Sequence, residues 1–208
     1  QNALLAHYIA QKDSVQPEER MHELTSFVSG GLKDFSISRR REKLAWGVPV
    51  PDDSEHVMYV WFDALVSYIS AIGWPDDNER FLKWWPVTQI AGKDNLRQQA
   101  LMWQAMLLSA GLPLSRSIFI HGFITSGGQK MSKSLGNVIN PLELVEMYGV
   151  DAVRYILLRH ASHIEDSDLT LAVIHDHYTA HLANGLGNLV ARVMTLSAQH
   201  LSAPVVLR

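Results

Sequence analysis

Between residues 57 and 121, short apolar runs alternate with longer segments of mixed polarity. The run at 57–62 (VMYVWF) is rich in β-prone residues and short, which predicts a strand buried on both faces of a sheet. Two further short apolar runs, at 87–91 and 117–121, predict a second and a third strand. The three runs are far enough apart for a helix to lie between each pair.

The segments between these runs carry helix signals. Asp63 is a candidate N-cap for a helix over 64–72, and Gly73 would end it. A longer apolar helix is predicted from about 95 to 110, closed by Gly111. The order strand, helix, strand, helix, strand is typical of a parallel sheet with crossover helices. We therefore predict an α/β fold for this region.

The flanking segments are mainly helical. The first 33 residues predict helix, with a helix start at Pro17 and an end at Gly30. After the third strand come a Gly127-Gly128 turn, a polar loop over 129–137, and a short helix capped by Asn140 that ends at Gly149. A second helix is expected from a capping Asp151 to about 159, and a long one from about 170 to 197.

Two features indicate that the predicted fold needs further strands and helices to cover its apolar surfaces. Three parallel strands are few for a sheet that must be covered on both faces, so we expect the second half of a nucleotide-binding-type fold whose first half precedes Gln1. A small but complete α/β domain is the alternative. The long last helix carries an apolar seam that calls for other helices. The seam consists of Leu182, Leu186, Leu189, Val193 and Leu196.

Composition narrows the class of protein. Of 208 residues, 47% are apolar, which is enough for a packed core and excludes a disordered or low-complexity chain. The absence of cysteine excludes disulfides, a thiol nucleophile and cysteine-bound zinc, and fits a cytoplasmic protein. No signal peptide or membrane segment is indicated. The net charge of −3 means that any contact with nucleic acid must come from a local patch.

The most specific motif is Lys130-Met131-Ser132-Lys133-Ser134, which follows the glycine turn. Its two lysines alternate with small hydroxyl residues on a loop, where they can offer charges, hydroxyls and backbone N–H groups to a polyphosphate. Such groups can stabilise charge that develops on a leaving pyrophosphate. On residue chemistry alone, a solvated loop is an equal alternative.

This pentapeptide is the signature of class I aminoacyl-tRNA synthetases, and the wider chain resembles the methionyl-tRNA synthetase family. The resemblance extends over roughly residues 8–200. Matching stretches are 32–39 (LKDFSISR), 59–65 (YVWFDAL), Gly92-Lys93-Asp94, 121–125 (HGFIT), 149–155 (GVDAVRY) and 184–189 (NGLGNL). The resemblance implies a division into a helical remnant of the connective insertion (1–33), the second half of the Rossmann-type catalytic domain (34–122), a module with the signature loop (123–168), and the start of the anticodon-binding domain (169–208).

The resemblance also implies the reaction: ATP, accompanied by Mg²⁺, activates methionine to methionyl-adenylate, and the acyl group passes to tRNA(Met). Lys130 and Lys133 would stabilise the pyrophosphate and carry the catalysis. The implied ATP-binding residues are Gly92, Asp94, His121, Ile124, Lys130, Met131, Ser132 and Lys133. Those implied for methionine are Trp61, Ala64, Leu65, Tyr68, Asp94, Gln99 and Trp103. Asn188 and Arg192, four apart on one helix, would contact the anticodon.

Three departures from the family pattern bear on these expectations. Gln98 and Gln99 stand where the family commonly has Phe-His, which affects the shape of the methionine pocket. The His-Ile-Gly-His motif of the first half does not occur in these 208 residues, so we expect this chain alone to be inactive and its missing N-terminal half to be a partner. The cysteine-bound metal knuckle is also absent, so no zinc is expected.

His177 and His181 are four apart, but the sequence indicates no third metal ligand.

Two other functions stay open at this point. One is a class I synthetase for leucine, isoleucine, valine or cysteine. The other is a non-catalytic module that binds tRNA or a nucleotide and derives from such an enzyme.

Overall fold

A computed structural model describes residues 1–203 of the chain. The chain forms two compact units, Gln1–His121 and Gly122–Arg208, and each is described here by itself. The four-part division expected from the sequence stays a prediction.

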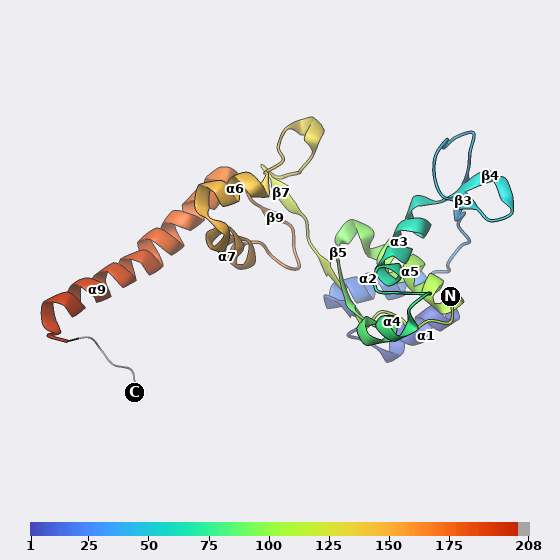
Figure 1. Cartoon of the computed structure of the whole chain (residues 1–208), viewed down its shortest axis with the longest axis horizontal. Coiled ribbons are helices and arrows are strands. Elements are labelled where there is room, and N and C mark those ends of the chain that lie inside the picture. Colours follow the sequence, from blue (N-terminus) through green and yellow to red (C-terminus); the bar gives the residue numbers. More distant parts are fainter. Residues whose placement is uncertain (204–208) are drawn as a thin grey trace. The chain divides into compact units, whose positions relative to one another are not determined.

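The first unit combines helices with two small sheets (Figure 1). Its helices are α1 (Asn2–Ala10), α2 (Glu18–Ser29), α3 (Val60–Ser70), α4 (Asn78–Trp84) and α5 (Trp103–Ser109). Its strands are β1 (Val15–Gln16), β2 (Ser38–Arg40), β3 (Pro49–Val50), β4 (Asp53–Met58), β5 (Thr88–Gly92) and β6 (Ser117–His121). A 3₁₀ turn (Lys93–Asn95) and a π-helical segment (Gln98–Met102) lead from β5 into α5.

The parallel sheet has the strand order β1-β6-β5. The strands expected at 87–91 and 117–121 are confirmed as β5 and β6, which pair in parallel from Thr88 with Ser117 to Gly92 with His121. The crossover between them is the helical segment that ends at Ser109, as expected. The prediction of an α/β unit with parallel strands is thus confirmed for this pair.

The strand expected at 57–62 is wrong in position and in partner. The strand β4 already ends at Met58, and it pairs antiparallel with β2 and β3 in a separate sheet. Tyr59 is the N-cap of α3, so the expected cap Asp63 lies inside the first turn of that helix. The third strand of the parallel sheet is instead the two-residue β1, in a segment expected to be helical.

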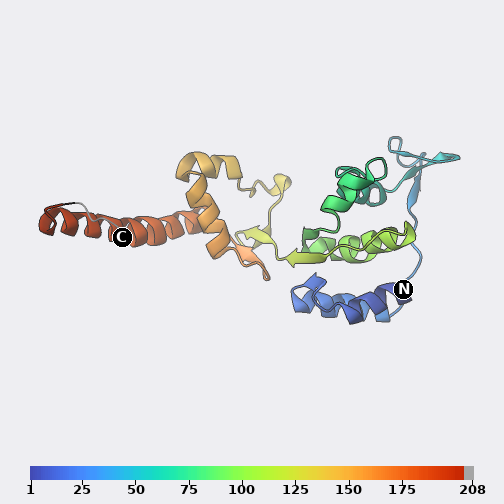
Figure 2. The ribbon, with the colours of Figure 1, turned by 60° about the horizontal axis from the view of Figure 1, so that its bottom comes forward.

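One face of the parallel sheet carries the core of the unit. Gln89 and Ala91 of β5 and Ile118 and Ile120 of β6 are buried, whereas the alternate residue Ile90 is 70% exposed. This period of two gives β5 and β6 one buried face each. The buried face packs on α1 and α2, which lie side by side (Figure 2).

A second core joins α3, α4 and α5. It contains Leu65 and Ile69 of α3, Phe81 of α4, and Trp103 and Leu107 at α5, all nearly inaccessible to solvent. The apolar positions of α3 are four apart, which is why one face of this helix is buried and the opposite face is open.

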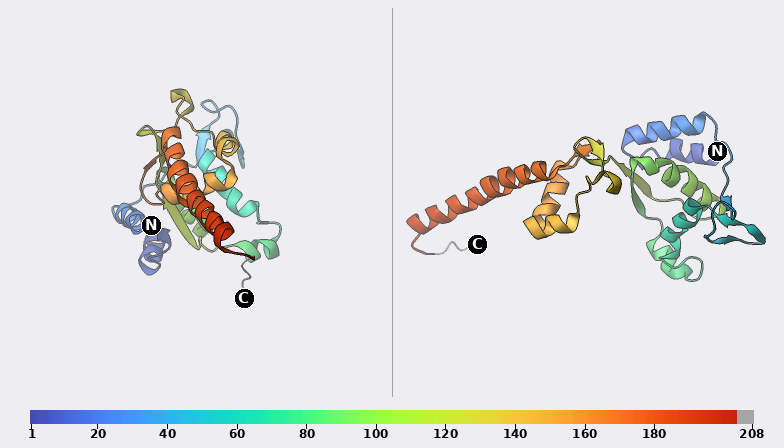
Figure 3. Two further views of the ribbon diagram at one scale, coloured as in Figure 1. Left: turned by 90° about the vertical axis from the view of Figure 1, so that its left-hand side faces the viewer. Right: turned by 90° about the horizontal axis from the view of Figure 1, so that it is seen from above.

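The second unit has a small sheet and a series of helices. The sheet has the order β8-β7-β9, with β7 (Ile124–Ser126), β8 (Gln129–Lys130) and β9 (Ser167–Asp168). The helices are α6 (Pro141–Tyr148), α7 (Val150–His160), α8 (Leu171–His177) and α9 (Asn188–His200), with a 3₁₀ turn (Lys133–Leu135) and a π-helical segment (Tyr178–Gly187). Figure 3 shows α8, the π-helical segment and α9 as one continuous rod.

Side-chain caps mark the starts of α6 and α8 in this unit. Asn140 caps α6, its Oδ1 accepting a hydrogen bond from the N–H of Leu142 at 3.0 Å, and Gly149 ends that helix as expected. Asp151 was expected to cap α7, but Gly149 is the N-cap and Asp151 lies in the first turn. Thr170 caps the long helix, which runs three residues beyond its expected end at 197.

The apolar seam of the long helix is open over most of its length. Leu186, Leu189, Val193 and Leu196 are each more than half exposed in the described chain. None of the helices in residues 1–203 combines the length and apolar character needed to cross a bilayer.

Candidate functional site

The carboxyl ends of β5 and β6 bring together three of the expected ATP residues. Gly92 and His121 are register partners at the last position of the two strands, and both are half-buried. Asp94 follows in the 3₁₀ turn and is exposed. In open α/β sheets, ligands bind beyond the carboxyl ends of parallel strands, so this edge is the part of the first unit best suited to a nucleotide.

A second group of expected residues meets where α3 faces the π-helical segment. The side-chain amide of Gln99 donates a hydrogen bond to the hydroxyl oxygen of Tyr68, with Nε2 and Oη 2.9 Å apart. The rings of Tyr68 and Trp103 lie 6.1 Å apart, centroid to centroid, at 49°. Gln99 and Trp103 are almost fully buried, whereas Tyr68 is 39% exposed. The three side chains therefore form one wall with an accessible phenol.

Three more of the expected methionine residues, Trp61, Ala64 and Leu65, lie on α3, whereas Asp94 lies in the 3₁₀ turn described above. Leu65 is buried against Trp103 in the second core, and Trp61 packs at the edge of that core. Ala64 is exposed, on the same helix face as the half-open Tyr68. The structure thus brings Trp61, Leu65, Tyr68, Gln99 and Trp103 into one neighbourhood of the first unit.

The π-helical segment is held by a buried polar network that the sequence analysis did not find. Gln104 donates from Nε2 to the carbonyl of Gln99 (3.0 Å) and to the hydroxyl of Ser115 (2.9 Å). The Oε1 of Gln104 accepts from the N–H of Ser115 (3.1 Å), and the Ser115 hydroxyl donates to Oε1 of Gln89 on β5 (2.6 Å). The available signal was the presence of glutamines in an otherwise apolar helix, because buried amides need partners.

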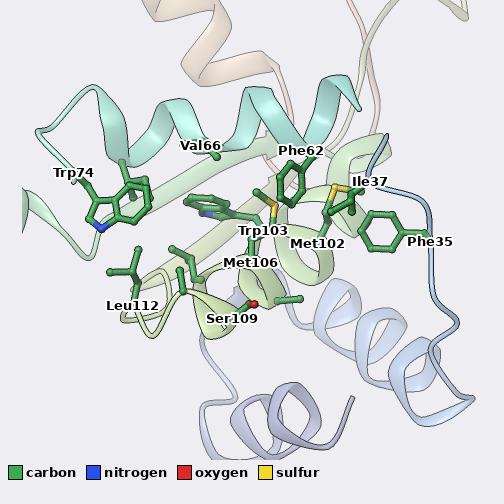
Figure 4. A pocket seen from close by; sticks show the side chains of 14 residues that line it. Phe35, Ile37, Phe62, Val66, Trp74, Met102, Trp103, Met106, Ser109 and Leu112 are labelled. Atoms are coloured by element: carbon green, nitrogen blue, oxygen red, sulfur yellow. The ribbon is translucent and has the colours of Figure 1, made fainter. Parts of the chain in front are cut away.

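An apolar cavity of about 480 Å³ lies between α3 and α5 (Figure 4). Of the residues expected to bind methionine, only Trp103 lines it. Its wall also includes Phe62, Val66, Met102 and Met106. Trp103 is therefore shared by this cavity and by the group that contains Tyr68 and Gln99.

The signature loop is built on the β7–β8 hairpin. Gly127 and Gly128 both have positive φ (65° and 72°), which the two-residue turn between Ser126 and Gln129 requires. Asp168 on β9 accepts from the N–H of Gly128 at 2.9 Å and from the Thr125 hydroxyl at 3.0 Å. The hairpin that leads into the loop is therefore fixed at its tip.

Asn137, which the sequence analysis did not single out, ties the two ends of the loop together. Its Oδ1 accepts from the N–H of Ser132 at 2.8 Å, and its Nδ2 donates to the carbonyl of Lys130 at 3.3 Å. Lys130 lies over the ring of Phe123, with Nζ 4.5 Å from the centroid. Lys133 is exposed at the start of the 3₁₀ turn, and Met131 is half-buried.

The remaining expected residues also belong to the second unit. Ile124 is on β7 and is 40% exposed. Asn188 and Arg192 lie one turn apart on α9, both exposed. The meeting of Ile124 and the signature loop with Gly92, Asp94 and His121 around one nucleotide stays a prediction.

The sequence indicated no third metal ligand beside His177 and His181, and the structure adds a candidate. In the described chain, His160 at the end of α7 joins them, and one ring nitrogen from each of the three lies within 4.8 Å of the others. The sequence could not show this, because His160 is on a different helix.

Comparison with known proteins gives the same family along the whole chain. The model of the family "tRNA synthetases class I (M)" matches residues 1–194. The methionine–tRNA ligase of Mesorhizobium japonicum is 50% identical over 200 residues, which are 96% of this chain and 38% of that protein. The corresponding ligase of Thermosynechococcus vestitus is 47% identical over 210 residues, 99% of this chain and 39% of the relative.

Solved structures agree with the sequence comparison. The crystal structure of Mycobacterium tuberculosis methionyl-tRNA synthetase bound by methionyl-adenylate superimposes with a TM-score of 0.87 at 45% identity. That match covers all of this chain and 41% of the other. The chain thus spans about two fifths of the length of the relatives it matches.

The parallel strands, the Lys-Met-Ser-Lys-Ser loop and these matches place the chain among the class I aminoacyl-tRNA synthetases. Within that class, the chain belongs to the family of tRNA synthetases class I (M), whose curated members are named methionine–tRNA ligases.

Proposed function

We propose that this chain supplies part of the active site of a methionine–tRNA ligase, which activates methionine with ATP and transfers it to tRNA(Met). The observation that carries the proposal is the family match over residues 1–194, at about half identity to named ligases. A relative that was solved with methionyl-adenylate supports the use of ATP by the same fold.

Each cluster has a role in this proposal. Gly92, Asp94, His121 and Ile124 hold the nucleotide, with Asp94 also receiving the ammonium group of methionine. Lys130 and Lys133 hold the phosphates, helped by Met131 and Ser132, and stabilise the charge of the leaving pyrophosphate. Mg²⁺ accompanies ATP and neutralises its phosphates. The protein contributes position and electrostatics more than covalent chemistry, as in other phosphoryl reactions.

The methionine side chain is assigned to the group formed by Trp61, Ala64, Leu65, Tyr68, Gln99 and Trp103. A thioether makes favourable contacts with aromatic rings, and Tyr68 and Trp103 offer two of them at one wall. The Nε2 atom of Gln99 donates to the Tyr68 hydroxyl, whereas its buried Oε1 has no hydrogen-bond partner among the described residues.

The long helix is assigned to tRNA. Exposed Asn188 and Arg192 can reach unpaired anticodon bases by hydrogen bonding and stacking. The expected cytoplasmic location stays a prediction.

The experiment is amino-acid-dependent ATP–pyrophosphate exchange by the full-length protein that contains this chain. Methionine is expected to support exchange at least tenfold better than leucine, isoleucine, valine or cysteine. A preference for one of these four would assign the protein to another class I synthetase. Exchange with none of them, although ATP or tRNA still binds, would favour the non-catalytic module.

The 208-residue chain tested alone is expected to show no methionine-dependent exchange, because it does not contain the His-Ile-Gly-His motif. Robust turnover by this chain would contradict that expectation, and the full-length protein serves as the positive control.

A further inference from the structure

Three histidines from two helical segments converge in the second unit, outside the residues assigned to catalysis. His160 ends α7, His177 ends α8, and His181 lies one turn further in the π-helical segment. The rings of His160 and His177 are stacked, with centroids 3.5 Å apart and planes 7° from parallel. The ring of His181 lies 4.7 Å from that of His160 and 5.9 Å from that of His177.

The hydrogen bonding of this cluster is incomplete. The Nε2 atom of His160 is buried and has no hydrogen-bond partner among the described residues. A buried ring nitrogen without a partner costs free energy, and a bound ion would satisfy it. The neutral ring is the form that ligates metals.

We propose that His160, His177 and His181 form a three-histidine site for a divalent late transition metal, with Zn²⁺ as the ion and water as its fourth ligand. Three neutral imidazoles favour Zn²⁺, Co²⁺, Ni²⁺ or Cu²⁺ and do not suit Mg²⁺ or Ca²⁺, which take oxygen ligands. The proposal does not depend on the function proposed above.

The distances allow such a site after modest side-chain rotation. Zn–N bonds of about 2.1 Å in tetrahedral geometry place two ligating nitrogens roughly 3.4 Å apart. The three ring nitrogens already lie within 4.8 Å of one another. His181 is exposed, so its ring has room to turn, and the rings of His160 and His177, now stacked, would have to separate for both to ligate one ion.

The consequence would be structural. The ion would fasten the last residue of α7 to the start of the long helical rod, on the two sides of the loop 161–170. Binding only to the folded arrangement would raise the stability of this unit by mass action.

The test uses the tag-free, full-length protein, stripped of metal with a chelator. Zinc bound per chain and the affinity for Zn²⁺ are compared for the wild type and for His181→Asn, whose exposed side chain can change without disturbing a core. The expected result is one zinc fewer per chain, or at least a tenfold weaker site, in the variant. Zinc bound at any other site of the protein is the same in the wild type and in the variant, so it does not affect this comparison.

His163→Asn is the matched control, because His163 is exposed and lies outside the cluster. It is expected to bind zinc like the wild type. Co²⁺ should give the strong visible absorption of a four-coordinate ion in the wild type and in His163→Asn, and lose it in His181→Asn. Equal zinc uptake by the wild type and His181→Asn, or equal loss in both variants, would overturn the proposal.

Discussion

Gly122 follows β6 directly, and the backbone of Glu165 passes close against its Cα. A Cβ at this position would overlap the Glu165 carbonyl group, which is main chain and cannot swing away. Gly122→Ala is therefore expected to lower the free energy of unfolding by about 1–3 kcal/mol, as overpacking does in buried sites. Chemical denaturation measures the effect, by comparing the midpoint and the slope of the unfolding transition between the wild type and the variant.

Gly30→Ala is the control for that substitution. Gly30 ends α2 in a right-handed conformation (φ −67°), and the nearest atoms to an added Cβ are 3.5 and 3.6 Å away, which is ordinary contact. Its stability should stay within about 0.5 kcal/mol of the wild type. Equal unfolding midpoints for both variants would contradict the close approach of Glu165.

Gln104 is the centre of the buried network that holds the π-helical segment. Gln104→Leu preserves volume but leaves the N–H of Ser115 and the carbonyl of Gln99 without their side-chain partner. We expect a loss of about 1–3 kcal/mol, the cost of buried polar groups left unsatisfied. Gln199→Leu, on the exposed surface of α9, should have little effect on thermal unfolding. If Gln104→Leu is as stable as the wild type, the network does not support the site.

At the scale of elements, the cap of α6 offers a direct test. Asn140→Ala removes the bond to the Leu142 N–H and should destabilise the helix by about 0.5–2 kcal/mol. Asn140→Ser keeps an accepting oxygen, loses the bond to Glu143 as alanine does, and is the matched control. Amide hydrogen exchange within α6 reports the difference, and equal protection in the alanine and serine variants would show that the cap contributes nothing.

The elements also show where sequence patterns suffice. The start of α6 was predictable because Asn140 caps it through a local hydrogen bond, whereas the expected caps Asp63 and Asp151 lie inside the first turns of their helices. The strand prediction for 57–62 was wrong because a short apolar run fits a buried strand as well as a helix. In this run the strand β4 ends at Met58 and the helix α3 follows its N-cap Tyr59. The two-residue β1 had no pattern of its own, since only its pairing with β6 makes it a strand.

At the scale of the whole molecule, some residues of the candidate site could be predicted from the sequence and others could not. The sequence located the Lys-Met-Ser-Lys-Ser loop, which is a contiguous motif, and the family resemblance indicated Gly92 and His121, which the structure places at the ends of β5 and β6. Gln104, Asn137 and His160 were not predictable, because each acquires its role from a partner on another element. Residues whose partners lie on another element therefore have no local signal in the sequence.

The most direct test of the proposed function is methionine-dependent ATP–pyrophosphate exchange by the full-length protein carrying Lys133→Ala. Removing a cation aimed at the developing pyrophosphate should cost about 10²–10³ in rate. Lys43→Ala, at an exposed turn outside the proposed site, should leave the rate unchanged. Exchange by Lys133→Ala at the wild-type rate would contradict the role of this loop in adenylation.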